Sequence, residues 1–91
     1  MTTFRELGVG DYFYFYEDDR LYRKEILSTS FDDEGDYMLT MCFRFGPTTM
    51  AHETIILNHV HLDKAHTTFG DTQLFSDLEI ANQYAKEQAN K

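Results

Sequence analysis

Basic residues are scarce in this sequence of 91 residues. Eight Lys and Arg stand against 16 Asp and Glu, which gives a net charge of −8. Neutralisation of phosphates by Lys and Arg drives most binding to nucleic acids and anionic membranes, so this charge argues against both kinds of partner. An acidic surface suits a basic protein partner, although many proteins are acidic only for solubility.

Cysteine and long apolar runs are also lacking. Cys42 is the single cysteine, which excludes an intrachain disulfide and favours a reducing compartment. No run approaches the roughly 18 apolar residues of a membrane span, and the first residues lack the basic and apolar regions of a signal peptide. We therefore expect a soluble, cytoplasmic protein.

Catalytic signatures are missing as well. The sequence contains no phosphate-binding glycine loop and no nucleophile elbow. A lone cysteine such as Cys42 is more often a packing residue than a nucleophile. We expect neither an enzyme nor a bound cofactor.

The segment most committed to one conformation is 10–16, where five aromatic residues follow a Gly-Asp pair. Aromatic side chains favour strands, and successive residues of a strand point to opposite faces. The pattern predicts a first strand from Asp11 to Tyr16, with Phe13 and Phe15 in the core. The outer face then carries Tyr12, Tyr14 and Tyr16.

Capping and turn signals place the elements around this strand. Thr3 and Glu6 have the spacing of a capping box, which predicts a helical turn over Phe4–Leu7. A second strand over 20–30 requires a bulge near Arg23 to reconcile its apolar residues. Gly35 suits a tight reversal, after which a third strand alternates cleanly from Tyr37 to Phe45 and is broken by 46–47.

The second half of the chain predicts two strands and a helix. A fourth strand from His52 to Leu62 is apolar on both faces, which suggests cover by the helix or a second subunit and hence a homodimer. A polar loop over Thr67–Asp71 precedes a short fifth strand, Thr72–Phe75. Ser76 begins a second capping box, and the helix that follows extends to about residue 89, with an apolar stripe made by Leu78, Ala81, Tyr84 and Ala85.

These elements predict one domain over residues 1–91, of the α+β class. We expect a small antiparallel curled sheet or partly open barrel of four or five strands, with a C-terminal helix.

The acidic residues concentrate in the first half of the chain. Between Asp11 and Asp36 lie nine acidic and three basic residues, which is −6 of the total of −8. The two densest groups lie at opposite ends of the second strand, some 30–35 Å apart at about 3.3 Å per residue. Together with the tyrosine row they form our predicted partner-binding set: Tyr12, Tyr14, Tyr16, Glu17, Asp18, Asp19, Asp32, Asp33, Glu34 and Asp36. The tyrosines are interpreted either as a protein-contact face or as a seat for the helix.

Histidines provide the alternative functions. On the expected fourth strand His59 and His61 would share a face about 7 Å apart, a workable spacing for two metal ligands. The string from His59 to His66 is similar to the H-x-H-x-D-H motif of metallo-β-lactamase-like hydrolases, but two residues separate Asp63 from His66. We therefore expect no metal site, and keep a histidine-dependent metalloenzyme as the lesser alternative. A small-ligand module, binding a nucleotide or metabolite in the barrel mouth or between subunits, would use Arg44, His52, His59 and His61.

One resemblance supports the fold. The opening L-G-V-G-D-Y-F-Y-F, followed by L-Y-R-K, resembles short bacterial and bacteriophage proteins that begin a small SH3-like barrel with a Leu-x-x-Gly-Asp-x-Phe lead-in. The similarity covers residues 4–24. It implies a phage or mobile-element setting, in which a compact acidic protein would act as an inhibitor of a host factor or defence system. It implies no catalytic residues.

Overall fold

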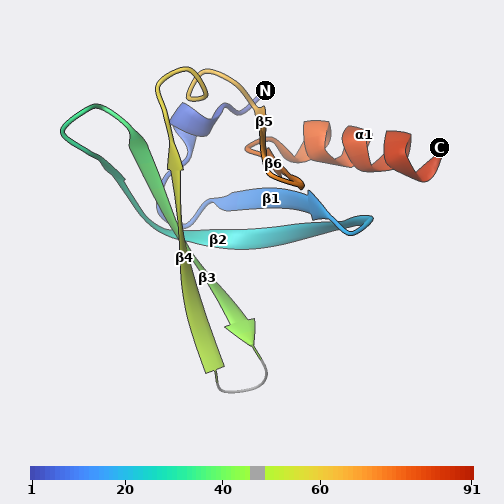
Figure 1. Cartoon of the computed structure of the whole chain (residues 1–91), viewed down its shortest axis with the longest axis horizontal. Coiled ribbons are helices and arrows are strands. Elements are labelled where there is room, and N and C mark those ends of the chain that lie inside the picture. The colour runs from blue at the N-terminus through green and yellow to red at the C-terminus, as the bar shows by residue number, and fades with distance from the viewer. Residues whose placement is uncertain (46–48) are drawn as a thin grey trace.

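Six antiparallel strands and one C-terminal helix make up the part of the chain that the computed structural model describes, namely residues 1–45 and 49–91, with side chains for 1–40 and 52–91. The strands form one sheet in the order β4-β3-β2-β1-β6-β5, curled into a half-barrel (Figure 1). The elements are a 3₁₀ turn (Phe4–Glu6), β1 (Tyr12–Glu17), β2 (Arg20–Phe31), β3 (Tyr37–Phe45), β4 (Thr49–Leu57), β5 (His66–Phe69), β6 (Thr72–Phe75) and α1 (Leu78–Ala89). The α+β class and the curled antiparallel sheet predicted from the sequence are confirmed.

The core lies on the concave face of the sheet, as the alternation of β1 predicts. Phe13 and Phe15 are buried and pack edge to face, with ring centroids 5.2 Å apart. Phe4, from the 3₁₀ turn, lies 5.5 Å from Phe13 and is fully buried. The other members of this cluster are Leu7, Ile26, Tyr37, Leu39, Leu57, Leu62 and Leu74.

A second, smaller apolar layer lies between the sheet and α1. The helix contacts β1, β2 and β6. Phe75 of β6 and Ala81 of α1 are fully buried there, and the ring of Tyr84 lies 5.4 Å from that of Phe75. Ala81 and Tyr84 confirm the predicted stripe on the helix, whereas Leu78 is exposed.

Two reversals have the backbone that their residues favour. Asp18 and Asp19 both have positive φ, at 52° and 63°, and join β1 to β2 as a two-residue turn of the kind that matches the twist of the flanking strands. Gly35 has φ 85° in the loop between β2 and β3, as expected from its lack of a Cβ.

The fourth strand is shorter than predicted. It ends at Leu57, because the side chain of Asn58 accepts a hydrogen bond from the Val60 N–H (3.1 Å) and its carbonyl accepts one from the His61 N–H (2.9 Å). The prediction of a strand through Leu62 was therefore wrong. Leu62 is nevertheless buried, because it reaches the core from this turn region rather than from a strand.

The segment expected as a polar loop contains a further strand. His66–Phe69 pairs with β6 to form a hairpin at the end of the sheet, so the described sheet has six strands rather than four or five. β-branched Thr67 and Thr68 favour the pleated conformation, and the turn at Gly70 provides the reversal.

Two further predictions about the strands need correction. The register of β2 against β3 shifts between Ile26 and Ser28, not near Arg23. The Ile26 backbone also forms hydrogen bonds with Gly10 and Asp11, and β2 pairs with β3 from Glu25 to Phe31. The helix packs on β1, β2 and β6, so it does not provide the cover expected over the fourth strand, and cover by a second subunit stays a prediction.

Asp77 rather than Ser76 caps the helix. Asp77 Oδ1 accepts from the Ile80 N–H (3.0 Å), and Oδ2 accepts from the Thr2 N–H (2.7 Å). Ser76 Oγ donates to the Thr2 carbonyl (2.7 Å). The pair of residues thus joins the start of α1 to the N-terminal segment. The N–H groups of Thr2 and Ile80 hold the pKa of Asp77 below its ordinary value.

We expect Asp77→Ala to lower the free energy of unfolding at neutral pH by an amount in the lower half of the ~0.5–2 kcal/mol range of N-cap losses, because the site is only partly buried. The native pKa is lowered, so this contribution is present above the unfolded pKa and lost as pH falls through the native one. Urea denaturation at about pH 7 and about pH 2 measures both effects. Asp33→Asn, in an exposed loop, is the control. A deficit that does not shrink in acid contradicts the assignment.

Candidate functional site

The tyrosine row divides into two parts along β1. Tyr16 packs against Tyr84 of α1, edge to face at 5.2 Å, and desolvation followed by the charge of Asp19 raises its pKa. Tyr12 is 40% exposed and Tyr14 is half-buried. One end of the row is therefore a helix seat, and the other end lies open.

The open end of the row borders a hollow of about 640 Å³, between the N-terminal segment, the start of β1 and the start of α1. We call it the acidic tyrosine pocket. Its charged and aromatic lining consists of Tyr12, Tyr14, Glu6, Asp11, Asp77 and Glu79. Four carboxylates thus surround two phenols, and the described lining contains no Lys or Arg.

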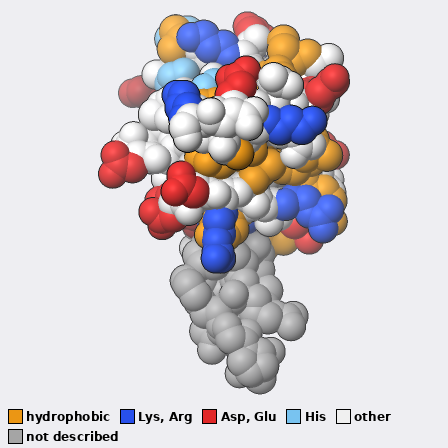
Figure 2. Space-filling model, turned by 90° about the vertical axis from the view of Figure 1, so that its right-hand side faces the viewer, with side chains coloured by type: hydrophobic (Ala, Val, Ile, Leu, Met, Phe, Trp, Pro, Cys, Tyr) orange, Lys and Arg blue, Asp and Glu red, His pale blue; other side chains and the backbone are white. Residues whose placement is uncertain are grey.

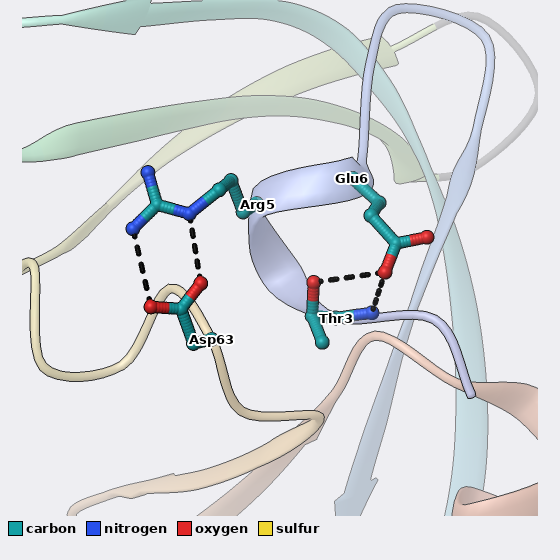
Figure 3. Close-up of polar contacts among 4 residues, drawn as sticks. All are labelled: Thr3, Arg5, Glu6 and Asp63. Carbon is teal, nitrogen blue, oxygen red and sulfur yellow. Dashed lines mark hydrogen bonds and ion pairs between the residues drawn. The ribbon is translucent and has the colours of Figure 1, made fainter.

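Backbone and hydroxyl donors hold three of these carboxylates. Asp11 Oδ2 accepts from the Gly8 N–H (2.8 Å), and Asp77 caps the helix as described above. Glu6 Oε1 accepts from the N–H and the hydroxyl of Thr3, at 3.2 and 3.1 Å (Figure 3). Such neutral donors orient a carboxylate and leave its charge in place. Glu79 is in the first turn of α1, where the helix dipole favours a negative charge.

The Arg5 side chain points away from Glu6 and the pocket, whereas that of Arg23 lies 4.1 Å from the ring of Tyr12. Arg5 extends from the other side of the 3₁₀ turn to Asp63, with Nε–Oδ1 2.8 Å and Nη2–Oδ2 3.4 Å (Figure 3). The hydrogen bond and charge of each partner raise the pKa of Arg5 and lower that of Asp63. Arg5 is therefore engaged with another acid and does not neutralise the pocket.

The predicted acidic groups lie at the two ends of β2, as the strand length implied (Figure 1). Glu17 accepts a hydrogen bond from the Thr72 hydroxyl (3.0 Å), and Asp18 and Asp19 form the turn that follows. On the face shown in Figure 2, basic side chains lie between the acidic ones. Because β2 separates them, the acidic groups at 17–19 and 32–36 lie at two separate sites.

At the other end of β2, Asp32 orders the loop that contains Asp33, Glu34 and Asp36. Its Oδ1 accepts from the N–H groups of Glu34 (2.9 Å) and Asp36 (2.7 Å). Carboxylate oxygens of Asp32, Glu34 and Asp36 lie within 4.8 Å of one another, and no other group of the described residues has this arrangement. Because the loop is mostly exposed and its hydrogen bonds are internal, the cluster is explained by its own turn.

The histidine string is dispersed. His59 and His61 lie in the turns after β4 rather than on one strand face, so their predicted ligand spacing was wrong. Asp63 binds Arg5, and His66 lies in β5, stacked on Phe75 at 4.4 Å. The structure thus gives no support to a shared metal site among them.

Of the small-ligand set, only the side chains of His52, His59 and His61 are among the described residues. His52 is exposed on β4, whereas the ring of His61 lies 6.1 Å from that of Phe69 and its Nδ1 has no hydrogen-bond partner among the described residues. Arg44 belongs to β3, but its side chain lies outside the described residues, as does that of Cys42.

Sequence reasoning missed most of the acidic tyrosine pocket. Glu6, Asp11, Asp77 and Glu79 are absent from the predicted set, because they come from the two ends of the chain. The clamp that joins these ends spans 75 residues, from Thr2 to Asp77. The sequence did contain one local signal for these acids. Both segments carry capping patterns, and acidic residues at the start of a helix keep their negative charge.

No protein-family model, curated protein or solved structure matches this chain. The similarity to SH3-like phage and bacterial proteins therefore stays a prediction. Among the described residues, α1 is too short and too polar to cross a membrane.

The divided tyrosine row gives a direct prediction. Tyr16→Ala removes the contact with Tyr84, so we expect it to lower the melting temperature. Tyr12→Ala removes a ring that is 40% exposed and lies outside the helix contact, so we expect a smaller loss of stability. Thermal denaturation followed by circular dichroism compares the two variants. Equal losses would show that Tyr12 is as much part of the fold as Tyr16.

Proposed function

We propose that the protein is a non-enzymatic binding protein that docks a basic protein partner at the acidic tyrosine pocket. The observation that carries this proposal is the combination of Tyr12 and Tyr14 with four carboxylates and no basic side chain in the described lining. Tyrosine is the kind of residue that interfaces favour, since it is large, rigid and able to hydrogen-bond.

An Arg or Lys side chain of the partner suits this pocket chemically. Its N–H groups would donate to the carboxylates in charge-assisted hydrogen bonds, which are shorter and stronger than neutral ones. Its cation would lie against a tyrosine ring. The protein's own Arg23 already lies 4.1 Å from the centroid of the Tyr12 ring, which is an internal example of this contact.

The charge of the whole chain favours the same kind of partner. A net charge of −8 steers basic surfaces toward the protein and repels phosphate backbones. Proteins that handle nucleic acids present such basic surfaces. By analogy with the phage setting, we propose that the partner is a host factor or defence protein of this class and that docking blocks or modulates it.

Glu79→Lys provides the sharpest test, with Glu87→Lys as a matched control. Both positions lie on α1 and both substitutions change the net charge equally, but only Glu79 lines the pocket. The partner recovered by affinity capture is titrated with each variant by calorimetry. We expect Glu79→Lys to weaken binding by about tenfold or more, or ~1.4 kcal/mol, and Glu87→Lys to have a much smaller effect.

The same titration at about 50 and about 500 mM salt tests the electrostatic contribution, because salt screens exposed charges. Affinity that is indifferent to salt, or equal losses for the two lysine variants, would contradict docking through this pocket.

The tyrosines have their own matched control. We expect the double variant Tyr12→Ala/Tyr14→Ala to lose affinity by about tenfold or more, as interface hot spots do. Tyr22→Ala removes an equally exposed ring on the opposite face of the sheet and should leave affinity unchanged. A melting curve confirms that Tyr14→Ala folds. Retention of full affinity by the double variant would remove the tyrosines from the interface.

A further inference from the structure

Each of the two edge strands of the half-barrel pairs on one side only, and its other edge has no strand partner among the described residues. β4 and β5 are the two ends of the sheet order, and the curl brings both to one cleft of about 510 Å³. The consecutive residues Glu53–Ile56 line this cleft from β4, and Phe69 lines it from β5. Because consecutive residues of a strand point to opposite faces, this lining places the cleft along the free edge of β4 as well as against its concave face. We call it the edge cleft.

The floor of the edge cleft contains an ion pair between Lys24 and Glu53. Lys24 Nζ lies 3.3 Å from Glu53 Oε2 and 4.3 Å from the centroid of the Phe15 ring. Glu17 adds a second carboxylate to the lining. Two acids against one paired lysine leave the described lining with a negative balance.

The walls of the edge cleft are apolar and exposed. Ile56 is 52% exposed on the β4 side, and Phe69 is 40% exposed on the β5 side. An edge strand also presents a row of backbone N–H and C=O groups without partners, which other chains can pair with. The cleft therefore combines a strand template, apolar walls and negative charge.

We propose that the edge cleft binds an extended segment of the basic partner, which adds to β4 as a further strand and closes the sheet toward β5. Strand addition of this kind takes its affinity from main-chain hydrogen bonds and its specificity from alternate side chains. The lining fits a segment in which apolar residues alternate with Lys or Arg. This inference rests on the proposed function for the partner's charge, but it uses a different site.

A second copy of the chain fits the cleft less well than such a segment. Each copy carries a net charge of −8, so two copies repel. A strand from a second copy also has neighbours in its own sheet, whereas a strand between β4 and β5 requires two free edges. A single extended segment has both.

The probe is a synthetic octapeptide of alternating Val and Lys, capped at both ends. We expect it to slow hydrogen exchange at free-edge amides of β4 within residues 52–57 by tenfold or more at saturation. The Val-Glu peptide of the same pattern should give no protection. A Val-Lys peptide methylated at alternate backbone nitrogens should lose it, because it cannot complete the ladder.

Ile56→Lys and Val60→Lys are the matched variants. The two positions are 52% and 54% exposed, but only Ile56 lines the edge cleft. We expect Ile56→Lys to weaken the Val-Lys peptide by about tenfold and Val60→Lys to have little effect. Exchange of the core amides checks that both variants are folded.

Three outcomes would overturn strand addition. The first is binding of the Val-Lys peptide without protection of β4, or equal binding of its methylated form. The second is edge protection that rises with protein concentration in the absence of peptide, which would assign the edge to a second copy. The third is partner binding that is lost in Glu79→Lys but unchanged in Ile56→Lys, which would retain the proposed function and remove this inference.

Discussion

The packing of Phe4 on Phe13 is the contact on which the rest of the structure depends. It places the 3₁₀ turn in one end of the curled sheet, where Phe4 is fully buried. The same turn holds the segment after β4, since the Phe4 and Arg5 N–H groups donate to the carbonyls of Lys64 and Leu62. The Tyr37 hydroxyl donates to the Leu7 carbonyl and ties β3 to the end of the turn. One aromatic contact therefore organises β1, β3 and the connection from β4 to β5.

The charge of the acidic tyrosine pocket follows from this arrangement. The N-terminal segment contributes Glu6 and Asp11, and its Thr2 is clamped to Ser76 and Asp77 at the start of α1. Neutral N–H and hydroxyl groups satisfy the carboxylates of Glu6, Asp11 and Asp77, so the fold uses these acids structurally without neutralising them. A basic side chain of a partner would add charge-assisted hydrogen bonds to these carboxylates.

Sequence patterns were reliable where one local rule decided the outcome. Alternation placed Phe13 and Phe15 in the core, and the lack of a Cβ suited Gly35 to its reversal. They failed where two rules competed. The apolar alternation through Leu62 favoured a strand, but the hydrogen bond from the Val60 N–H to the Asn58 side chain forms a turn that ends the strand at Leu57. Ser76 and Asp77 are both good caps, and the clamp to Thr2 decided between them. The acidic tyrosine pocket needs contacts between the ends of the chain, which no local pattern encodes.

The two proposed binding sites lie on opposite faces of β1, so both depend on its register. Tyr14 lines the acidic tyrosine pocket, and its neighbour Phe15 lines the edge cleft. A slip of one residue would exchange every side chain between the faces, which would place tyrosines in the core and phenylalanines in the pocket. The Asp18-Asp19 turn fixes that register, because Glu17 pairs with Arg20 across it. Asp18 and Asp19, which the sequence predicted as contact residues, thus have a structural role in this turn. Any contact with a partner would be a second role.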